Sequence, residues 1–255
     1  MSPLEHLQSI LNETYISEDG DEYKVELKPG LSDQQIDQLA KALPNGRISP
    51  DIRELLRFAS GFEFYGLDDV TFDGVGMFGF ENIFPYSIQL AGDGFGNFWI
   101  LDVANDGKWS SVFYVCHDPA VVVRHSNDLG EFIKHIDEYG KKGKDSNLDI
   151  IHESTVMDIW KMNDGFIDIG NARKSSGRTL SEFALGLPDH FTVVDLRNKP
   201  NRTGFAWGKF GPNIDKAVRH QTELIWGFEK GGKQSKPDKT DQQNKKGILS
   251  RLFGR

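Results

Sequence analysis

Cysteine is nearly absent from this sequence, since Cys116 is its only thiol. One cysteine forms no internal disulfide and excludes a metal site built from several thiolates. Long apolar runs are lacking as well: Asp102 and Pro85 interrupt the longest stretches, whereas a membrane-spanning helix needs about 18 apolar residues in a row. Residues 1–6 show no basic segment leading into an apolar one, as a secretory signal peptide would. We therefore expect a cytoplasmic protein.

Patterns that carry chemistry are also missing. The histidines show no zinc spacing. Residues 92–96 (Gly-Asp-Gly-Phe-Gly) lack the Lys-Ser/Thr of a phosphate loop and indicate a tight turn between strands. Residues 69–74 imitate the start of a calcium loop, but Phe80 stands where the twelfth position needs a glutamate. Cys116 and His117 are neighbours on a predicted strand, so they point to opposite faces and form no nucleophile–base pair. We expect no catalytic residue, no metal and no cofactor.

Aromatic residues and acidic charge are plentiful by contrast. The 18 Phe and 5 Trp of this 255-residue chain are ample for one large domain or two small ones. Residues 230–255 hold eight Lys/Arg and two Asp, which leaves 22 basic and 36 acidic residues in positions 1–229. The net charge of −8 thus divides into +6 for the tail and −14 for the body. Such a body favours cationic partners over nucleic acid, although an ordinary acidic surface is an equally good interpretation.

Two helices are signalled near the N-terminus. Ser32 and Gln35 form a capping box, and Leu31 can pack on Ile36 as a hydrophobic staple, so a helix is predicted from there to Pro44. The pair Ser49-Pro50 then predicts a second helix, because serine is a good cap and proline suits the first helical position. It ends at Ser60-Gly61.

A strand-rich block follows the two helices. Residues 97–103 and 111–117 are apolar on both faces, as central strands are, and the turn signal at 105–107 joins them into a hairpin. Residues 121–123 form a further strand. A helix capped by Asn127 or Asp128 and closed by Gly140 completes the pattern. Residues 1–140 therefore predict an α+β domain, an antiparallel sheet flanked by helices.

The remaining sequence divides into a smaller unit and a tail. Residues 141–148 are typical of a linker. Residues 150–229 predict a small α+β unit with helices near 154–162 and 180–185 and strands near 191–196, 203–210 and 222–228. The sequence leaves open whether this unit packs on the first domain. Residues 230–255 predict a disordered basic tail with a short amphipathic end.

The ordered series of motifs in the first half resembles the SUKH superfamily, which includes many bacterial toxin-immunity proteins. The resemblance covers about residues 20–140 and rests on Leu43-Pro44, on residues 52–61 with two adjacent leucines, on Asp93-Gly94-Phe95-Gly96-Asn97 with 100–102, on 112–118 ending in His-Asp, and on 129–133. Ser60-Gly61 replaces the family's usual Asn-Gly. Residues 150–229 lie outside the family's pattern.

What the resemblance implies is a non-enzymatic binding protein that neutralises a partner toxin by stoichiometric occlusion. A regulatory or scaffolding subunit of a larger, membrane-associated assembly is the alternative, and an undetected hydrolase is a third. Aromatic residues in a glycine-rich acidic loop suit an interface with a basic protein. The residues expected to bind the partner are Phe62, Phe64, Tyr65, Asp68, Asp69 and Asp73. The opposing interpretation is that the aromatic residues fold back over the core.

Two further surfaces have basic residues. Arg202, Lys209 and Arg219 interleave with Phe205, Trp207 and Phe210, which can suit a nucleic acid, but a small sheet with an aromatic core and solvated arginines is favoured. At the end of the tail, a helix would place apolar residues on one side with basic residues flanking them, which predicts a weak contact with an anionic membrane or a partner. The residues of this contact are Lys245, Lys246, Ile248, Leu249, Arg251, Leu252 and Phe253. The alternative is that this end only keeps the chain soluble.

Overall fold

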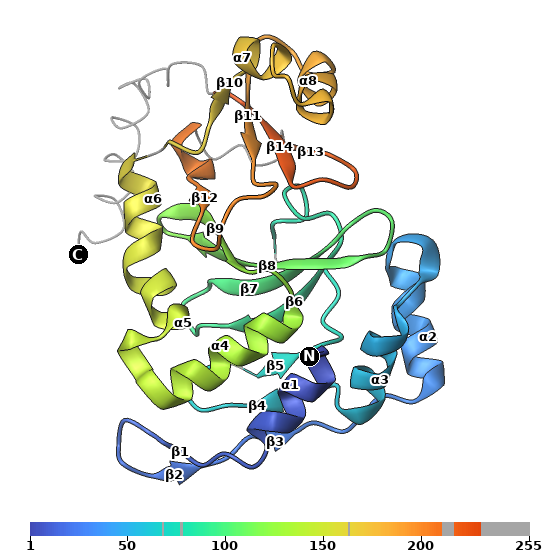
Figure 1. Ribbon diagram of the computed structural model, residues 1–255, viewed down its shortest axis with the longest axis vertical. Coiled ribbons are helices and arrows are strands. Elements are labelled where there is room, and N and C mark those ends of the chain that lie inside the picture. The colour runs from blue at the N-terminus through green and yellow to red at the C-terminus, as the bar shows by residue number, and fades with distance from the viewer. Residues whose placement is uncertain (68, 77–78, 163, 211–216, 231–255) are drawn as a thin grey trace, which may run out of the picture.

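The computed structural model describes residues 1–67, 69–76, 79–162, 164–210 and 217–230. Asp68 and the predicted tail contact at 245–253 lie outside these described residues. The fold class is α+β, as predicted (Figure 1). No helix within the described part of the chain is both long and apolar enough to cross a membrane.

The N-terminal third holds three helices and five short strands. They are α1 (Pro3–Ile10), β1 (Tyr15–Ile16), β2 (Glu22–Tyr23), β3 (Glu26–Leu27), α2 (Asp33–Ala42), α3 (Pro50–Phe58), β4 (Gly61–Glu63) and β5 (Val70–Thr71), with a 3-10 turn at Pro44–Gly46. The predicted capping box of α2 is present: the Ser32 hydroxyl accepts from the Gln35 amide, and the Gln35 side chain accepts from the Ser32 amide. Pro50 opens α3. Both predicted helices are confirmed.

The central sheet has the order β12-β9-β8-β7-β6, and all its neighbouring strands are antiparallel. Its strands are β6 (Ser87–Gly92), β7 (Phe98–Val103), β8 (Trp109–His117), β9 (Ala120–Ser126) and β12 (Gly204–Phe205). The predicted hairpin is confirmed, with Leu101 opposite Val112. The loop between β6 and β7 is a tight turn, in which Gly94 and Gly96 both adopt positive φ angles.

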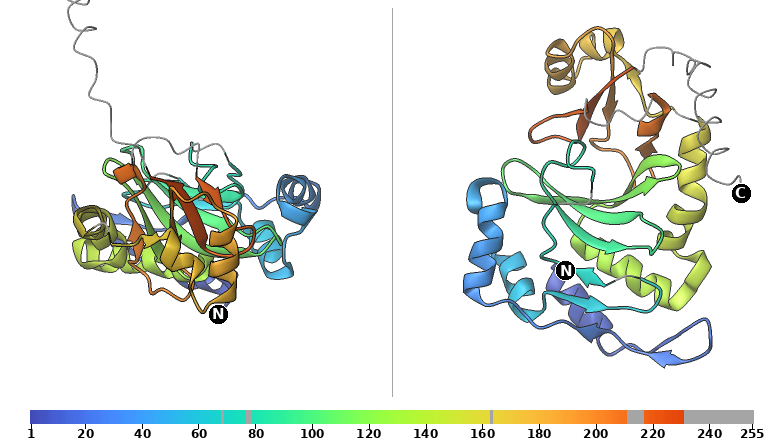
Figure 2. Two further views of the ribbon diagram at one scale, coloured as in Figure 1. Left: turned by 90° about the horizontal axis from the view of Figure 1, so that it is seen from above. Right: turned by 180° about the vertical axis from the view of Figure 1, so that it is seen from behind.

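Each face of this sheet packs against a different part of the chain, which explains why its strands are apolar on both faces. Trp99, Leu101 and Tyr114 belong to a large core with α1, α3 and α4 (Leu129–Lys142). Ile100 and Phe113 point the other way and pack with Trp226 and other residues of the C-terminal part. In Figures 1 and 2, α4 covers one face of the sheet and the C-terminal elements lie across the other.

The C-terminal part forms its own sheet, with the order β10-β11-β14-β13. Its elements are α5 (Asn147–Ile150), a π-helical turn (Ile151–Thr155), α6 (Val156–Met162), β10 (Ile167–Asp168), α7 (Ile169–Arg173), α8 (Arg178–Leu185), β11 (Phe191–Asp195), β13 (Val218–Arg219) and β14 (Ile225–Glu229). The Trp226 indole donates to the Ile83 carbonyl (2.8 Å). Thus the question that the sequence left open is answered: this part packs on the first.

Three sequence expectations were wrong in detail. Gly140 does not end its helix, because α4 continues to Lys142 and Gly143 with φ 53° follows it. The predicted linker 141–148 holds the last turn of α4, a 3-10 turn at Gly143–Asp145 and the start of α5. The strand predicted at 203–210 is only two residues long, since the chain turns into a 3-10 helix at Trp207–Phe210.

Candidate functional site

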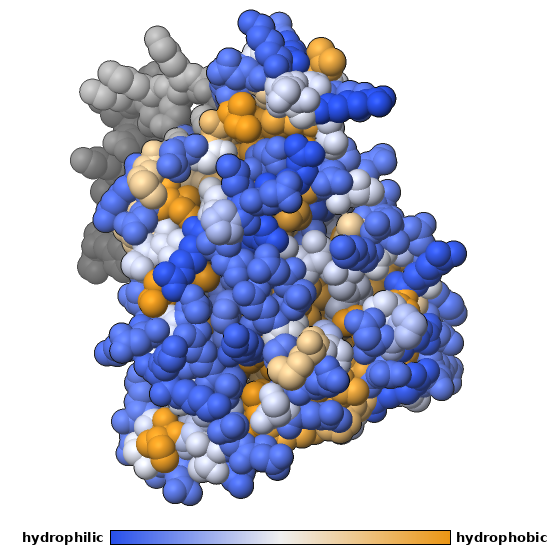
Figure 3. Space-filling model, in the orientation of Figure 1, coloured by the Kyte–Doolittle hydropathy of each residue, from blue (hydrophilic) through white to orange (hydrophobic). Residues whose placement is uncertain are grey.

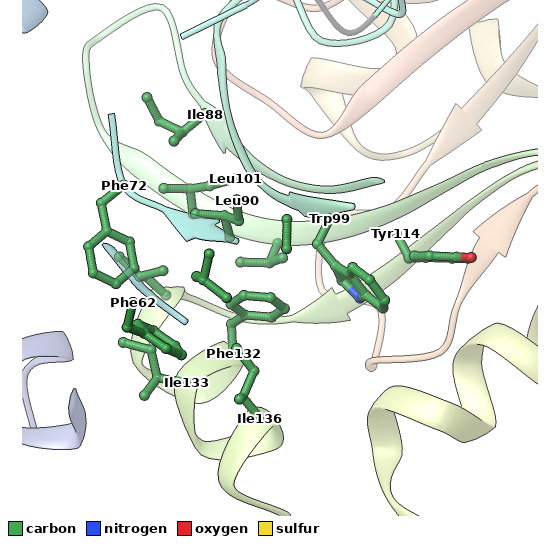
Figure 4. Packing of buried hydrophobic residues seen from close by; sticks show 14 of the residues in the cluster. Phe62, Phe72, Ile88, Leu90, Trp99, Leu101, Tyr114, Phe132, Ile133 and Ile136 are labelled. Atoms are coloured by element: carbon green, nitrogen blue, oxygen red, sulfur yellow. The ribbon is translucent and has the colours of Figure 1, made fainter. Parts of the chain in front are cut away.

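Phe62 and Phe64 were predicted as partner-binding residues, and the structure contradicts this. Phe62 is completely buried and Phe64 is 4% exposed. Strand β4 lies between β3 and β5, so its side chains alternate, and Glu63 alone of the three faces solvent. Figure 4 shows Phe62 within the core with Phe72 and Ile133. For these two aromatic residues the opposing interpretation, that they fold over the core, is correct.

Tyr65, Asp69 and Asp73 are exposed, and two of them line the same region of the surface. Tyr65 keeps 42% of its surface accessible. Asp69 forms an ion pair with Lys28 (2.6 Å). Both line a hollow of about 250 Å³ beside β2 and β4. Asp73 follows β5 and does not line this hollow.

A second hollow of about 380 Å³ adjoins the first, and four tyrosines line it. We call this pair of hollows the tyrosine groove; its tyrosines are Tyr15, Tyr23, Tyr65 and Tyr139. Tyr23 and Tyr65 line both hollows, with ring centroids 5.4 Å apart. Four of the six tyrosines in the chain therefore gather in one region. Tyr23, Tyr65 and Tyr139 are accessible there, whereas Tyr15 is only 2% exposed.

The groove is built from three segments distant in sequence. Tyr15 and Tyr23 lie opposite each other in the β1–β2 hairpin, and their rings stack at 5.3 Å. The Phe64 ring packs edge-on against both tyrosine rings, with centroid distances of 5.1 Å to Tyr15 and 5.4 Å to Tyr23. Tyr139 comes from the last turns of α4, where Asp137 accepts a hydrogen bond from the Tyr15 hydroxyl (2.8 Å). Aromatic packing thus fixes the hairpin against the helix.

Gly140 and Gly66 make this packing fit. A Cβ atom at Gly140 would overlap the Tyr15 ring and would lie 2.8 Å from Cζ of Phe64. A Cβ atom at Gly66, whose φ is +83°, would lie 2.8 Å from the Tyr139 hydroxyl. Gly140 is therefore a site of close ring-to-backbone approach inside a helix.

Burial favours the neutral hydroxyl form of Tyr23 and Tyr139. Burial raises the pKa of Tyr23 to about 12, with Tyr139 and Tyr65 adding to the rise. Burial also raises the pKa of Tyr139, and the carboxylates of Glu18 and Asp149 add to it. The groove therefore offers ring faces and hydroxyl groups instead of phenolate charge.

Carboxylates surround the tyrosines. The β1–β2 hairpin has four exposed acids: Glu18, Asp19, Asp21 and Glu22. Glu26 and Glu63 line the smaller hollow together with Lys24. Lys141 reaches the larger hollow but pairs with Asp137 (2.9 Å) and Glu13 (3.3 Å). In Figure 3 the hairpin, at the lower left, shows a small apolar patch within a hydrophilic surface.

The reactive side chains elsewhere hold the fold together. Cys116 is buried whereas His117 faces solvent, as predicted for neighbours on a strand. The His117 ring nitrogen Nδ1 bonds the Asn97 side chain (2.8 Å). Asp93 accepts from the Phe95 amide (2.8 Å) and the Tyr114 hydroxyl (2.7 Å). Burial works to raise the pKa of Asp93, but these hydrogen bonds and those from Asn97 lower it.

Among the residues that the structure describes, no group of three or more His, Cys, Asp or Glu side chains is placed to hold a metal ion.

The basic and aromatic residues of the interleaved pattern do not form one surface. Arg219 is buried against Asp102 (2.8 Å), so it is not a solvated arginine either. Phe205 is in the core. Lys209 lies over the Trp160 ring (4.0 Å), and Arg202 donates to the Asn147 side chain.

Sequence reasoning missed Tyr15, Tyr23 and Tyr139. A signal for the first two was present, since they flank an acidic hairpin turn at 17–22. Tyr139 continues the apolar face that Phe132 and Ile136 form on its helix, and periodicity alone does not show that this end of the face opens to solvent.

Comparison with protein families found one match. The family described as SMI1 / KNR4 family (SUKH-1) matches residues 30–135, from just before α2 to the second turn of α4. Searches of curated proteins and of solved structures found no match. Of the four groove tyrosines only Tyr65 lies inside the family match. The resemblance seen in the sequence is confirmed over residues 30–135, which match the model of the SUKH-1 family.

Proposed function

We propose that this protein is a non-enzymatic binding module that neutralises a basic toxin by stoichiometric occlusion at the tyrosine groove. The SUKH domain is consistent with an immunity-type or protein-binding module. The observation that carries the proposal is the cluster of accessible tyrosines, Tyr23, Tyr65 and Tyr139, in a groove that carboxylates also line. Tyrosine is enriched at the centres of protein interfaces, because a rigid ring buries a large area at little entropic cost.

Charge supports a cationic partner. The −14 of residues 1–229 raises the encounter rate with a positively charged protein. Toxins that act on nucleic acids carry cationic surfaces, because they must attract phosphates. An inhibitor with the opposite charge covers such a surface directly, and no chemical turnover is needed.

The test is affinity capture from the native host with the wild type, Tyr65→Ala and Tyr86→Ala. Tyr86 is a matched control, since it is 40% exposed against 42% for Tyr65 and lies outside the groove. We expect a basic protein that the wild type and Tyr86→Ala retain, and that Tyr65→Ala retains at least about tenfold less, as a hot spot of about 1.4 kcal/mol or more implies. Equal capture by all three proteins would place the interface elsewhere.

A further inference from the structure

The larger hollow of the tyrosine groove has the composition of a cation site. Tyr23, Tyr65 and Tyr139 line it with accessible rings, and Glu18 lines it as well, whereas Tyr15 is only 2% exposed there. The negative face of an aromatic ring attracts an ammonium or guanidinium group within about 6 Å of the centroid. At about 380 Å³ the hollow is at the small end of the range for ligand sites, roughly 300–1,000 Å³, which suits one long side chain.

The charged residues near the hollow favour a side chain with positive charge. Lys141 is the cation that reaches the hollow, and Asp137 and Glu13 neutralise it. Glu18 has no ion-pair partner among the described residues, and Asp19, Asp21 and Glu22 follow it in the same hairpin. An anionic side chain in the larger hollow would meet these carboxylates, while Lys141, the lysine that lines this hollow, is already paired. A neutral side chain would leave Glu18 unpaired at the edge of the interface.

The arrangement also suits the shape of a basic side chain. The aliphatic stem of arginine or lysine packs on ring faces while its charged head stays near polar groups. Tyr23 and Tyr65 stand as a tilted pair, with their rings at 42°, and the exposed Glu18 adds a carboxylate to the lining of the hollow. A planar guanidinium group also stacks on aromatic rings.

We propose that the larger hollow receives an arginine or lysine side chain from the partner protein, held by the rings of Tyr23, Tyr65 and Tyr139 and by Glu18. This inference rests on the proposed function, because it names the chemical group through which the partner is recognised. A basic side chain of the partner is then the anchor of the interface, and the nearby carboxylates raise its association rate.

The experiment uses the full chain with carbon-13-labelled tyrosine rings and three blocked pentapeptides. The peptides share the sequence Gly-Ser-X-Ser-Gly, where X is arginine, lysine or citrulline, the neutral analogue of arginine. Four labelled rings belong to the groove, and Tyr86 and Tyr114 lie outside it as internal references. We expect the arginine or lysine peptide to shift the groove resonances, with citrulline about tenfold weaker, as roughly 1.4 kcal/mol of cation–π and charge attraction implies.

Two variants make the result specific. Glu18→Gln should weaken the binding of the arginine and lysine peptides several-fold. Glu54→Gln removes an exposed charge on α3 and should leave their binding unchanged. Citrulline binding as tightly as arginine and lysine would overturn the inference, and so would groove resonances that none of the peptides shifts. Partner capture is a separate readout: loss of capture in Tyr65→Ala with no preference for charged peptides would retain the proposed function and reject the cation site.

Discussion

The ion pair between Asp102 and Arg219 is the most deeply buried charged contact among the described side chains. Asp102 is completely inaccessible, and Arg219 lies over the Trp226 ring, 5.0 Å from its centroid. One oxygen of Asp102 and the Nε of Arg219 have no hydrogen-bond partner within the described residues. The pair joins the central sheet to β13, so its charges are held where two parts of the chain meet. Removal of one partner leaves the other charge buried and uncompensated.

We predict that Arg219→Met lowers the free energy of unfolding by about 3–5 kcal/mol at pH 7. Burial raises the pKa of Asp102, and Arg219 opposes this rise. Without Arg219 the pKa rises further, so the folded state binds a proton that the unfolded state has released. Stability then falls as pH rises above the unfolded value of about 4. Urea unfolding at pH 5 and pH 7 measures this: the loss should be smaller at pH 5.

The double variant Asp102→Asn/Arg219→Met is the control for that prediction. It has no titrating group at the site, so the additional loss between pH 5 and pH 7 should disappear. If Arg219→Met has the same stability as the wild type at both pH values, the buried pair contributes nothing to the junction.

Cys116 gives a second prediction at the level of a single residue. It is 5% exposed, and burial raises the pKa of its thiol. Because the thiolate is the reactive form, iodoacetamide at pH 8 should modify the native protein at least about tenfold more slowly than the protein in urea. Mass spectrometry measures both rates. Equal rates would show that this strand opens readily to solvent.

Among the elements, those with local signals were predictable from the sequence. The capping box at Ser32 and the proline at position 50 mark α2 and α3 without any tertiary contact. The strands β7 and β8 were visible because both faces of each are apolar, which follows from the two cores that they separate. Short strands such as β1, β2 and β12 depend on their neighbours for pairing and carry too few residues to show a period.

Helix α4 shows where local rules mislead. Glycine near a helix end usually indicates a C-cap, but Gly140 is kept inside the helix because the rings of Tyr15 and Phe64 press against it. The partner-binding prediction for Phe62 and Phe64 failed for a related reason. Proximity to an acidic loop indicates an interface only for side chains that point outward, and strand alternation turns these two inward.

We predict that Gly140→Ala destabilises the protein although alanine is the better helix former. Propensity alone would stabilise by about 1 kcal/mol, whereas the overlap with two rings should cost about 1–3 kcal/mol or force Tyr15 out of place. The melting temperature and the Tyr15 ring resonance report the two effects. Lys134→Ala, an exposed change on the same helix, is the control and should alter neither. A stabilised Gly140→Ala protein with an unmoved Tyr15 would contradict the packing described.

For the whole molecule, the C-terminal part acts as the second cover of the central sheet. The division at residues 140–150 stays a prediction from composition, but Ile100, Phe113 and Val122 are buried on the face that meets Trp226 and Phe205. A single sequence shows that this face is apolar and does not show which segment covers it. The groove is likewise distributed, since its tyrosines come from three separated segments.

We predict that a chain ending at residue 145 does not fold independently. Loss of the C-terminal part would expose the apolar face around Phe113 and Val115 to water. Strong binding of the dye ANS and no cooperative melting transition are expected by fluorescence and circular dichroism. A chain ending at Lys230 keeps every core residue described and should melt cooperatively. A cooperative transition in the shorter chain would establish residues 1–145 as an independent domain.

The central claim, that an acidic tyrosine groove recognises a basic protein, is tested most directly by binding kinetics with the captured partner. Association and dissociation rates are measured across a salt series for the wild type, Glu18→Lys, Tyr65→Ala and the controls Glu54→Lys and Tyr86→Ala. The account predicts slower association for Glu18→Lys and at higher salt, because exposed charges are screened as the Debye length shortens to roughly 3 Å at 1 M. It predicts faster dissociation for Tyr65→Ala. Rates that neither salt nor any groove variant changes relative to the controls would contradict it.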